Sequence, residues 1–285
     1  VNVSTTGTGA IDLDGLGALT LSDVDTANGA ITVTSAGALT VTDVASGTNG
    51  NISLTTSSGD ITGLATVNAG SGTVTLNSAG AIVDDSDAST VVTGGVLTAD
   101  AAGAITIDST VASADISTSA AGAIALDETD GITLTDLDTT DGSITVSAGG
   151  ALTATDVVAG GGTGDSVTLS TTTGGAVATL VTGADAVSIT ADAGDITIGA
   201  VTATAGTLGV TATTGSINDA ADDSTADFTA VGLITLTAQD EIGVLGSGTD
   251  TDLEFAASSS VNVSTTGTGA IDLDGLGALT LSDVD

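Results

Sequence analysis

The sequence predicts an all-β protein that folds as a parallel β-solenoid with about eleven rungs per 260 residues. Three observations lead to this fold class. Short runs of Val, Ile and Leu alternate with polar residues at a period of two, as in strands that bury one face. The runs recur every 19 to 28 residues, with a glycine-rich corner between them. The first 25 residues, Val1 to Asp25, return letter for letter as Val261 to Asp285.

The segment from Ile31 to Val44 shows how one rung is built. Ile31 and Val33 point to one side of an extended chain and the intervening threonines point to the other. A Ser-Ala-Gly corner then leads to a second strand, which begins at Leu39. Equivalent strands are predicted to begin at the same phase of successive rungs, at Ile31, Ile52, Val74, Leu97, Ile116, Ile144, Val167, Val187, Leu208, Ile234 and Val261.

A glycine precedes one strand in nearly every rung, and we expect these glycines to occupy one corner of the cross-section. A tight bend or a positive φ angle would favour glycine at such a corner. The corner glycines are Gly37, Gly59, Gly80, Gly103, Gly122, Gly150, Gly194 and Gly215.

Two other fold classes fit the pattern less well. A β-sandwich needs hairpin turns between antiparallel strands and gives no reason for a glycine at one phase of each repeat. A helical repeat needs an apolar period near 3.6, which is absent, and the Gly, Thr and Val content opposes helix. The region from Asn218 to Ser260 is less regular and holds both aromatic residues, Phe228 and Phe255, so we expect a bulge or local cap there rather than a second domain.

The repeated stretch divides the chain into residues 1–260, one solenoid repeat unit, and residues 261–285, the start of the next identical unit. Since the chain also contains no Met, we expect it to be a segment of a longer tandem array. A second repeat lies inside the unit: residues 9–43 align without gaps on residues 122–156, with 20 of 35 positions identical. At about 4.8 Å per rung, one unit should add roughly 50 to 55 Å to an unbranched fibre of copies joined end to end.

The charge balance argues against several classes of partner. The 285 residues carry 36 acidic side chains and no Lys, Arg or His, which gives a formal charge of −36. Nucleic acid and anionic membranes are bound through Lys and Arg, so neither is expected as a partner, and no apolar run is long enough for membrane insertion. Cations are the natural counter-species. The lack of Cys, Met, Trp, Tyr and Lys makes the chain chemically inert, which suits an extracellular protein at the cell surface.

Three runs carry a resemblance to a known class of proteins. They are GAITVTSAGALTVTDV at 29–44, GDITIGAV at 194–201 and VTATTGSI at 210–217. Their texture resembles the large repetitive surface proteins of bacteria, whose best-known members are the filamentous-haemagglutinin-type adhesins. The resemblance implies a right-handed parallel β-helix on the cell surface and implies no particular ligand.

An enzyme is not expected. Polysaccharide lyases of this shape need a basic residue to take up a proton, and the chain has none. Hydrolysis by paired carboxylates needs only acidic residues, and the candidate pairs would be Asp12 with Asp14 or Asp136 with Asp138. These pairs lie on repeated rungs, where a unique active site is not expected.

The same acidic residues are candidate metal ligands, because oxygen-rich clusters suit Ca²⁺. Carboxylates spaced i, i+2 share one face of an extended chain. The sequence requires no cofactor, and calcium is the candidate ion. The alternative is that Asp ends strands and keeps sheet edges soluble. The candidate calcium ligands are Asp12, Asp14, Asp84, Asp85, Asp87, Asp136 and Asp138, with further pairs or clusters at Asp23 and Asp25, at Asp219, Asp222 and Asp223, and at Asp250 and Asp252.

These features predict a structural segment of an extracellular filament, sheath or giant surface protein, whose partners are copies of itself joined end to end. The alternative is the stalk of a secreted adhesin whose binding tip lies outside this segment. A third candidate, an ice-binding threonine array, is weaker because successive strands read Thr-Val-Thr, Ser-Leu-Thr, Thr-Leu-Asn and Thr-Ala-Asp, which interrupts the array. Cations and surface glycans are the other candidate partners.

Overall fold

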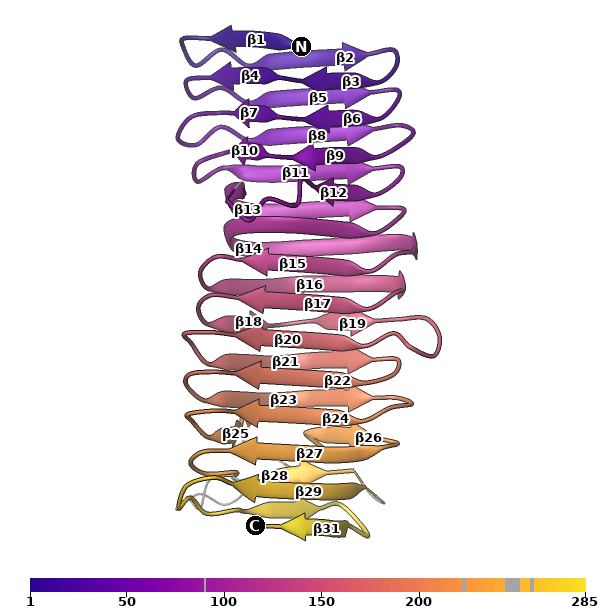
Figure 1. Cartoon of the computed structure of the whole chain (residues 1–285), viewed down its shortest axis with the longest axis vertical. Coiled ribbons are helices and arrows are strands. Elements are labelled where there is room, and N and C mark those ends of the chain that lie inside the picture. Colours follow the sequence, from indigo (N-terminus) through magenta and orange to yellow (C-terminus); the bar gives the residue numbers. More distant parts are fainter. Residues whose placement is uncertain (90, 222–223, 244–251, 257–258) are drawn as a thin grey trace. The chain divides into compact units, whose positions relative to one another are not determined.

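The chain makes about 13 turns of a parallel β-solenoid, which confirms the fold class predicted from the sequence (Figure 1). The computed structural model describes residues 1–89, 91–221, 224–243, 252–256 and 259–285, and no helix occurs among them. Contacts between Cα atoms divide the chain into two compact units. The first is Val1–Ile132 with Leu137–Asp141, and the second is Thr133–Asp136 with Gly142–Asp285.

Each rung of the first unit passes through three ladders of parallel strands, here named ladders 1, 2 and 3 (Figure 1). Ladder 1 holds β2 (Ile11–Gly15), β5 (Ile31–Ser35), β8 (Ile52–Thr56), β11 (Thr73–Ser78) and the second half of β13 (Val92–Ala101). Ladder 2 holds β3 (Leu19–Leu21), β6 (Leu39–Val41), β9 (Ile61–Leu64), β12 (Ile82–Asp84) and β15 (Ile124–Glu128). Ladder 3 holds β1 (Asn2–Thr5), β4 (Asp23–Thr26), β7 (Asp43–Ala45), β10 (Thr66–Asn68) and the start of β13. The long strand β14 (Ile105–Ala121) passes through all three ladders.

The rungs of the second unit pass through ladders 4, 5 and 6. Ladder 4 holds β17 (Ile144–Ala148), β20 (Val167–Thr171), β22 (Val187–Ala191), β24 (Leu208–Ala212), β27 (Leu233–Ala238), β29 (Ser260–Thr265) and β31 (Thr280–Val284). Ladder 5 holds β18 (Leu152–Ala154), the first halves of β21 (Ala176–Gly183) and β23 (Ile196–Ala203), and β25 (Ile217–Asp219). Ladder 6 holds β19 (Val157–Ala159), the second halves of β21 and β23, β26 (Phe228–Ala230), β28 (Leu253–Phe255) and β30 (Leu273–Gly275). One further strand, β16 (Ile132–Asp141), holds residues of both units.

Within each unit the predicted residues stack in register, with one exception. Ile31, Ile52, Val74 and Leu97 stack in ladder 1, and the predicted residues from Ile144 to Val261 stack in ladder 4. Ile116, however, lies opposite Ala99, and Ala114 is the residue opposite Leu97. Strand β15 also falls in the 28-residue interval from 116 to 144, which the prediction treated as a single rung step. About 13 turns over 285 residues correspond to about 12 per 260 residues, one more than expected.

Across the internal repeat of 113 residues, equivalent strands shift by one ladder. Ile11 lies in ladder 1, opposite Ile31. Its aligned counterpart Ile124 lies in ladder 2, opposite Ile105, in the column that starts at Leu19. Homologous strands therefore occupy different ladders, because each is a generic alternating strand that fits either one.

The core of each unit is a set of columns of identical or similar apolar side chains, with buried hydroxyls at the corners. In ladder 1, for example, Ile31 and Ile52 are both fully buried. At the corner after β5, the buried Ser35 Oγ donates to Gly17 O at 2.7 Å, and after β8 Thr56 Oγ1 donates to Gly59 O at 2.9 Å. These bonds satisfy turn carbonyls that would otherwise lack a donor in the interior.

The predicted glycine corner forms a continuous column in the first unit. A Cβ on Gly122 would lie 2.5 Å from Ala104 N, and one on Gly37 would lie 2.7 Å from Ala18 N, so close approach of the preceding rung selects glycine. Positive φ contributes at only two of the eight predicted positions, Gly59 (79°) and Gly194 (87°). In the second unit the predicted glycines 150, 194 and 215 each precede a strand of ladder 5 by two residues.

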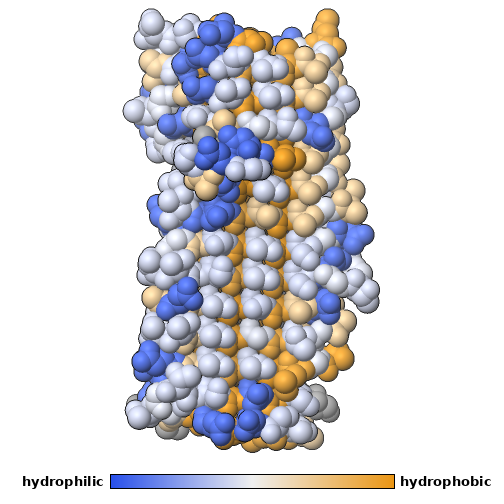
Figure 2. Space-filling view, in the orientation of Figure 1, coloured by the Kyte–Doolittle hydropathy of each residue, from blue (hydrophilic) through white to orange (hydrophobic). Residues whose placement is uncertain are grey.

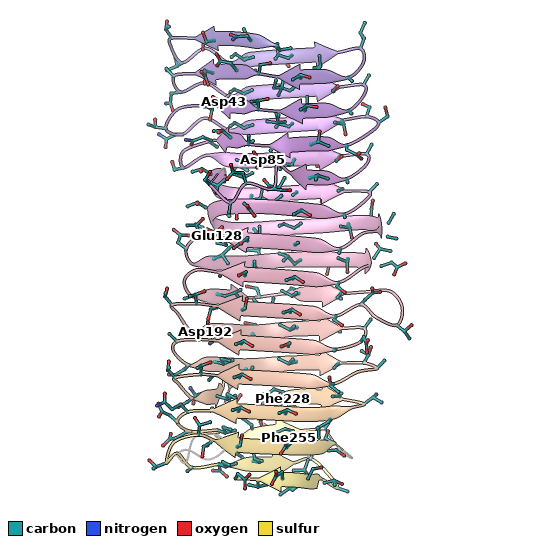
Figure 3. The ribbon with its side chains drawn as sticks, in the orientation of Figure 1. Asp43, Asp85, Glu128, Asp192, Phe228 and Phe255 are labelled. Carbon is teal, nitrogen blue, oxygen red and sulfur yellow. The ribbon has the colours of Figure 1, made fainter. Side chains whose placement is uncertain are left out.

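The region from Asn218 to Ser260 continues the ladders in its described residues. Phe228 stacks on Phe255 in ladder 6, with ring centroids 5.3 Å apart and an interplanar angle of 29° (Figure 3). Both rings are fully buried. The described strands of this region therefore keep the register of the ladders.

Candidate functional site

Asp12 and Asp14 lie on the outward face of β2, and both are exposed. In the next strand the register places Thr32 beside Asp12 and Thr34 beside Asp14, so the neighbouring rung adds hydroxyls rather than carboxylates. Within the described ranges, neither Asp belongs to a group of three acidic side chains whose oxygens lie within 4.8 Å of one another. A pair of carboxylates supplies only part of the roughly six to eight oxygens that Ca²⁺ takes.

Asp84, Asp85 and Asp87 accept hydrogen bonds from the backbone that directly follows them. Ser86 N–H donates to Asp84 Oδ2 at 2.8 Å, and Asp87 N–H donates to Asp85 Oδ1 at 3.0 Å. Ser89 donates to Asp87 Oδ1 through N–H at 3.1 Å and through Oγ at 2.8 Å, and these bonds lower the pKa of Asp87. Asp84 is 7% exposed, and burial raises the pKa of its carboxyl. The three lie close in sequence, yet they form no convergent group of three carboxylates.

The other predicted pairs occupy the outside of the solenoid. Asp136 and Asp138 are exposed on either side of the buried Leu137 in β16. Asp25 shares its strand with Asp23, and burial followed by the neighbouring Asp23 carboxyl raises the pKa of Asp25. These outward positions are consistent with the alternative interpretation, in which Asp keeps the sheet edges soluble.

Part of the predicted cluster at 219–223 and one member of the pair at 250–252 are not covered by the structure. Asp222, Asp223 and Asp250 lie outside the described residues. Asp219 is described, at the end of β25, and it joins a group that the sequence did not predict.

Asp219, Asp227 and Glu254 form a carboxylate triad, the group of three acidic residues that the described part of the chain brings together. Each contributes a carboxylate oxygen that lies within 4.8 Å of those from the other two. Asp227 is 3% exposed and Glu254 is 1% exposed. The backbone N–H of Glu254 donates to Asp227 Oδ2 at 2.9 Å.

The ladder register places the triad. Asp227 directly precedes Phe228 and Glu254 directly precedes Phe255, and the two phenylalanines pair in adjacent rungs of ladder 6. Two acidic residues separated by 27 positions are thereby stacked. A sequence signal existed, since the chain has only two Phe and each follows an acidic residue.

Electrostatics in the triad favour a neutral acid or a bound cation. Burial raises the pKa of Asp227 to about 9, and the nearby carboxyls of Asp219 and Glu254 add to the rise, while the N–H bond from Glu254 opposes it. Three carboxylates this close cannot all be ionised in a dry interior without a counter-charge. The triad can therefore share protons, or it can hold a hard divalent cation such as Ca²⁺ through its oxygens.

Glu128 is a second buried carboxyl that sequence reasoning missed. It is 1% exposed, and Oε2 accepts from Ser109 Oγ at 2.6 Å and from Val111 N–H at 3.1 Å. Burial raises the pKa of Glu128 from 4.5 to about 7. The rarity of Glu could have drawn attention to it, because the chain has three Glu among its 36 acidic residues and two of the three are buried in the core.

A shallow hollow of about 300 Å³ lies on the first unit, lined by small and polar side chains. Ser117 Oγ donates to Asp100 Oδ1 at 2.6 Å within it. Its lining holds no aromatic side chain on which a sugar ring could stack.

Comparison with known protein families, curated proteins and solved structures found no match to this chain. The structure places it among parallel β-solenoid repeat proteins by architecture. A search of the described residues for a helix that is long and apolar enough to span a bilayer also gave none.

Proposed function

We propose that this chain is a structural repeat segment of an extracellular filament, sheath or giant surface protein, in which copies join head to tail. The more specific form is the stalk of a bacterial surface adhesin. That form is supported by the resemblance of its repeats to such proteins and by a composition without Cys, Met, Trp, Tyr or Lys.

The observation that carries the proposal is that the second 25-residue copy stacks on the preceding rungs as an internal rung does. Val261 and Val263 are buried and lie opposite Ile234 and Leu236 of β27.

The join between one 260-residue repeat unit and the next is already present inside the chain, where residue 260 meets residue 261. Asn2 lies opposite Asp23 in the first copy, and Asn262 lies opposite Asp283 in the second, so the two copies adopt the same register. Strand β29 of the second copy pairs with β27 over six consecutive residues. An added unit would therefore stack as an ordinary internal rung.

The proposal gives the fibre a repeat length. About 12 rungs per 260 residues, at about 4.8 Å each, add roughly 55 to 60 Å per unit. Fibre diffraction should show the strand spacing along the fibre axis together with this longer repeat.

A matched pair of substitutions tests the join. Val3 is half-buried and its counterpart Val263 is 1% exposed. We expect Val263→Asp to destabilise the single chain by about 3 kcal/mol or more, because it buries a carboxylate. Val3→Asp should leave the melting temperature of the single chain within about 2 °C of wild type but block fibre growth, because stacking buries this site. Electron microscopy measures fibre growth, and thermal melting measures the stability of the single chain.

Fibres of unchanged length from the Val3→Asp chain would overturn the head-to-tail join. Copies could be joined covalently in one giant chain or stacked as separate subunits. The intact mass of the native protein distinguishes the two, because a giant chain has the mass of many repeat units and a stacked subunit has the mass of one chain. A native single chain that stays monomeric at all concentrations would also reject the proposal.

A further inference from the structure

The dipeptide Asn-Gly occurs twice in the sequence, both times at a turn of the first unit. Asn28-Gly29 lies between β4 and β5, and Asn49-Gly50 lies between β7 and β8, one rung further on. These turns are at the left edge of Figure 1, and Figure 2 shows a mostly polar surface along that edge. Both asparagines are exposed. The same dipeptide is thus present in two surroundings that can be compared within one molecule.

Asn-Gly is the dipeptide in which asparagine most readily loses its side-chain amide as ammonia. The backbone nitrogen of the glycine attacks Cγ of the asparagine, the bond from Cγ to Nδ2 breaks, and a succinimide ring closes as ammonia leaves. Water then opens the ring at either carbonyl, which gives aspartate or isoaspartate. Glycine favours the reaction because it has no side chain and its backbone turns freely. The reacting amide and N–H groups must first leave their hydrogen bonds.

At the first turn, three hydrogen bonds hold the reacting groups. Gly29 N–H donates to Thr26 Oγ1 at 2.9 Å. Asn28 Oδ1 accepts from Thr48 Oγ1 at 3.1 Å and from the backbone N–H of Asn49 at 2.9 Å. Thr26 Oγ1 also donates to Gly29 O at 2.7 Å, and Thr26 is 5% exposed, so a buried hydroxyl closes this turn. Reaction at Asn28 requires all three bonds to break.

The second turn is one residue longer, and its glycine N–H is left unpaired. Ser46 Oγ is the closing hydroxyl and donates to Gly50 O, four residues on, whereas Thr26 reaches a carbonyl three residues on. Gly50 N–H donates to no atom among the described residues. The nitrogen that must attack therefore has no hydrogen bond to give up.

The side chain of Asn49 is also held more loosely than that of Asn28. Asn49 Oδ1 accepts one hydrogen bond, from Ser71 Oγ. The same hydroxyl lies 3.3 Å from Thr48 O, which competes for its single proton. One shared bond therefore restrains the reacting groups at the second turn, compared with three at the first.

We propose that Asn49 is a site of spontaneous deamidation in the folded chain and that Asn28 is protected from it. Each hydrogen bond that must break slows the reaction roughly 2- to 10-fold. Two additional bonds therefore slow Asn28 relative to Asn49 by roughly 5- to 100-fold. Local opening of an exposed turn is enough to reach the reactive geometry, because the ladders on either side stay paired.

Deamidation would change both charge and backbone at this turn. One added carboxylate takes the formal charge from −36 to −37 in a chain without a basic residue. Isoaspartate also adds one carbon to the main chain, next to the bond that Asn49 N–H makes to the preceding rung. The composition excludes oxidation of Cys, Met, Trp or Tyr, so this turn is a reactive point in an otherwise inert chain. The reaction does not depend on how copies join.

The test compares the two asparagines in the same sample. The chain is incubated at pH 7.5 and 37 °C, sampled over weeks and digested with pepsin. Mass spectrometry measures conversion of amide to carboxyl at each Asn, and electron-transfer fragmentation distinguishes isoaspartate from aspartate. A parallel incubation in urea that unfolds the chain gives the rates set by sequence alone. We expect Asn49 to convert roughly 5- to 100-fold faster than Asn28 in the folded chain and at a similar rate to Asn28 in the unfolded chain.

Matched substitutions test the cause of the difference. Thr26→Val keeps the shape of the side chain but removes the acceptor for Gly29 N–H, and should speed conversion of Asn28 alone by roughly 2- to 10-fold. Ser71→Ala, at an exposed position, should speed conversion of Asn49 alone by a similar factor. Asn49→Gln should remove the fast site. Circular dichroism at each time point shows that each variant is folded.

Equal rates at Asn28 and Asn49 in the folded wild type would overturn the proposal. An Asn49 that stays unmodified in the folded chain while it converts in urea would do the same. Folded Thr26→Val and Ser71→Ala chains that both keep the wild-type rates would show that these hydrogen bonds do not control the reaction, and would also reject it.

Discussion

Glu128, the last residue of β15, stacks on a column that begins with the valines of ladder 3. Successive rungs place Val67 opposite Val92, Val92 opposite Ser109 and Ser109 opposite Glu128. The carboxyl thus takes a position that is apolar in the earlier rungs, and the Ser109 hydroxyl supplies a hydrogen bond to it. A buried acid of this kind makes stability depend on pH.

We predict that stability falls as pH rises from about 4.5 to 7, because the folded state holds the Glu128 proton in that range and the unfolded state does not. The loss amounts to roughly 3 kcal/mol. Glu128→Gln should make this part of the profile less steep and stabilise the chain at pH 8, while the buried Asp227 keeps its own contribution to the slope. Urea unfolding from pH 4 to 8 measures it, with Asp12→Asn as an exposed control that keeps the wild-type slope. If the unfolding free energy of Glu128→Gln fell with pH as steeply as that of Asp12→Asn, Glu128 would not be the responsible group.

The carboxylate triad gives a second prediction at the residue scale. A divalent cation that binds only the folded state stabilises it by about 2.7 kcal/mol at a hundredfold excess over its dissociation constant. We expect calcium to raise the melting temperature at fixed ionic strength and a chelator to reverse the effect. Asp227→Asn with Glu254→Gln should abolish the response, because the triad then keeps a single carboxylate.

The control for calcium binding is Asp12→Asn with Asp14→Asn, which removes a pair predicted from the sequence and leaves the triad intact. Calcium should still stabilise this variant. Equal melting temperatures with and without chelator in the wild type would leave proton sharing as the state of the triad.

At the scale of the strand, alternation and spacing were enough to predict ladder 4. Its first five strands begin at Ile144, Val167, Val187, Leu208 and Leu233, and each is a separate run bounded by turn residues. The prediction failed at Ile116, which lies within β14, where residues 105–121 run through three ladders without a glycine corner. With no turn to mark the phase, a shift of two residues keeps the same side chains inward and cannot be detected from alternation.

The candidate sites were harder to predict than the strands, because they depend on which residues stack across rungs. Asp227 and Glu254 meet only if the irregular stretch between them closes one full turn, and its length departs from the mean spacing. Glu128 and Ser109 meet across 19 residues for the same reason. The sequence predicted that Asp residues spaced i, i+2 share one face of a strand, but it could not show which carboxylates are buried together.

At the scale of the whole molecule, charge should make stability depend strongly on salt. The chain has a formal charge of −36 and no cation to form an ion pair. Asp108 and Asp127 are opposite each other in the register, and burial, with nearby Asp84 and Asp127, raises the pKa of Asp108. Each close pair of exposed carboxylates costs about 1 kcal/mol in water, and the extended unfolded chain relieves this repulsion by separating the charges.

We therefore predict that the melting temperature rises by about 5 °C or more between 10 mM and 500 mM NaCl, with a chelator present throughout. Tetramethylammonium chloride should give the same rise, because screening depends on ionic strength and a specific site does not accept so large a cation. Sucrose at matched osmolality is the uncharged control. A rise in melting temperature with NaCl but not with tetramethylammonium chloride would indicate a sodium site. A melting temperature that responds to neither salt would contradict the prediction, because it would show that the ladders already keep the carboxylates far enough apart in the folded state.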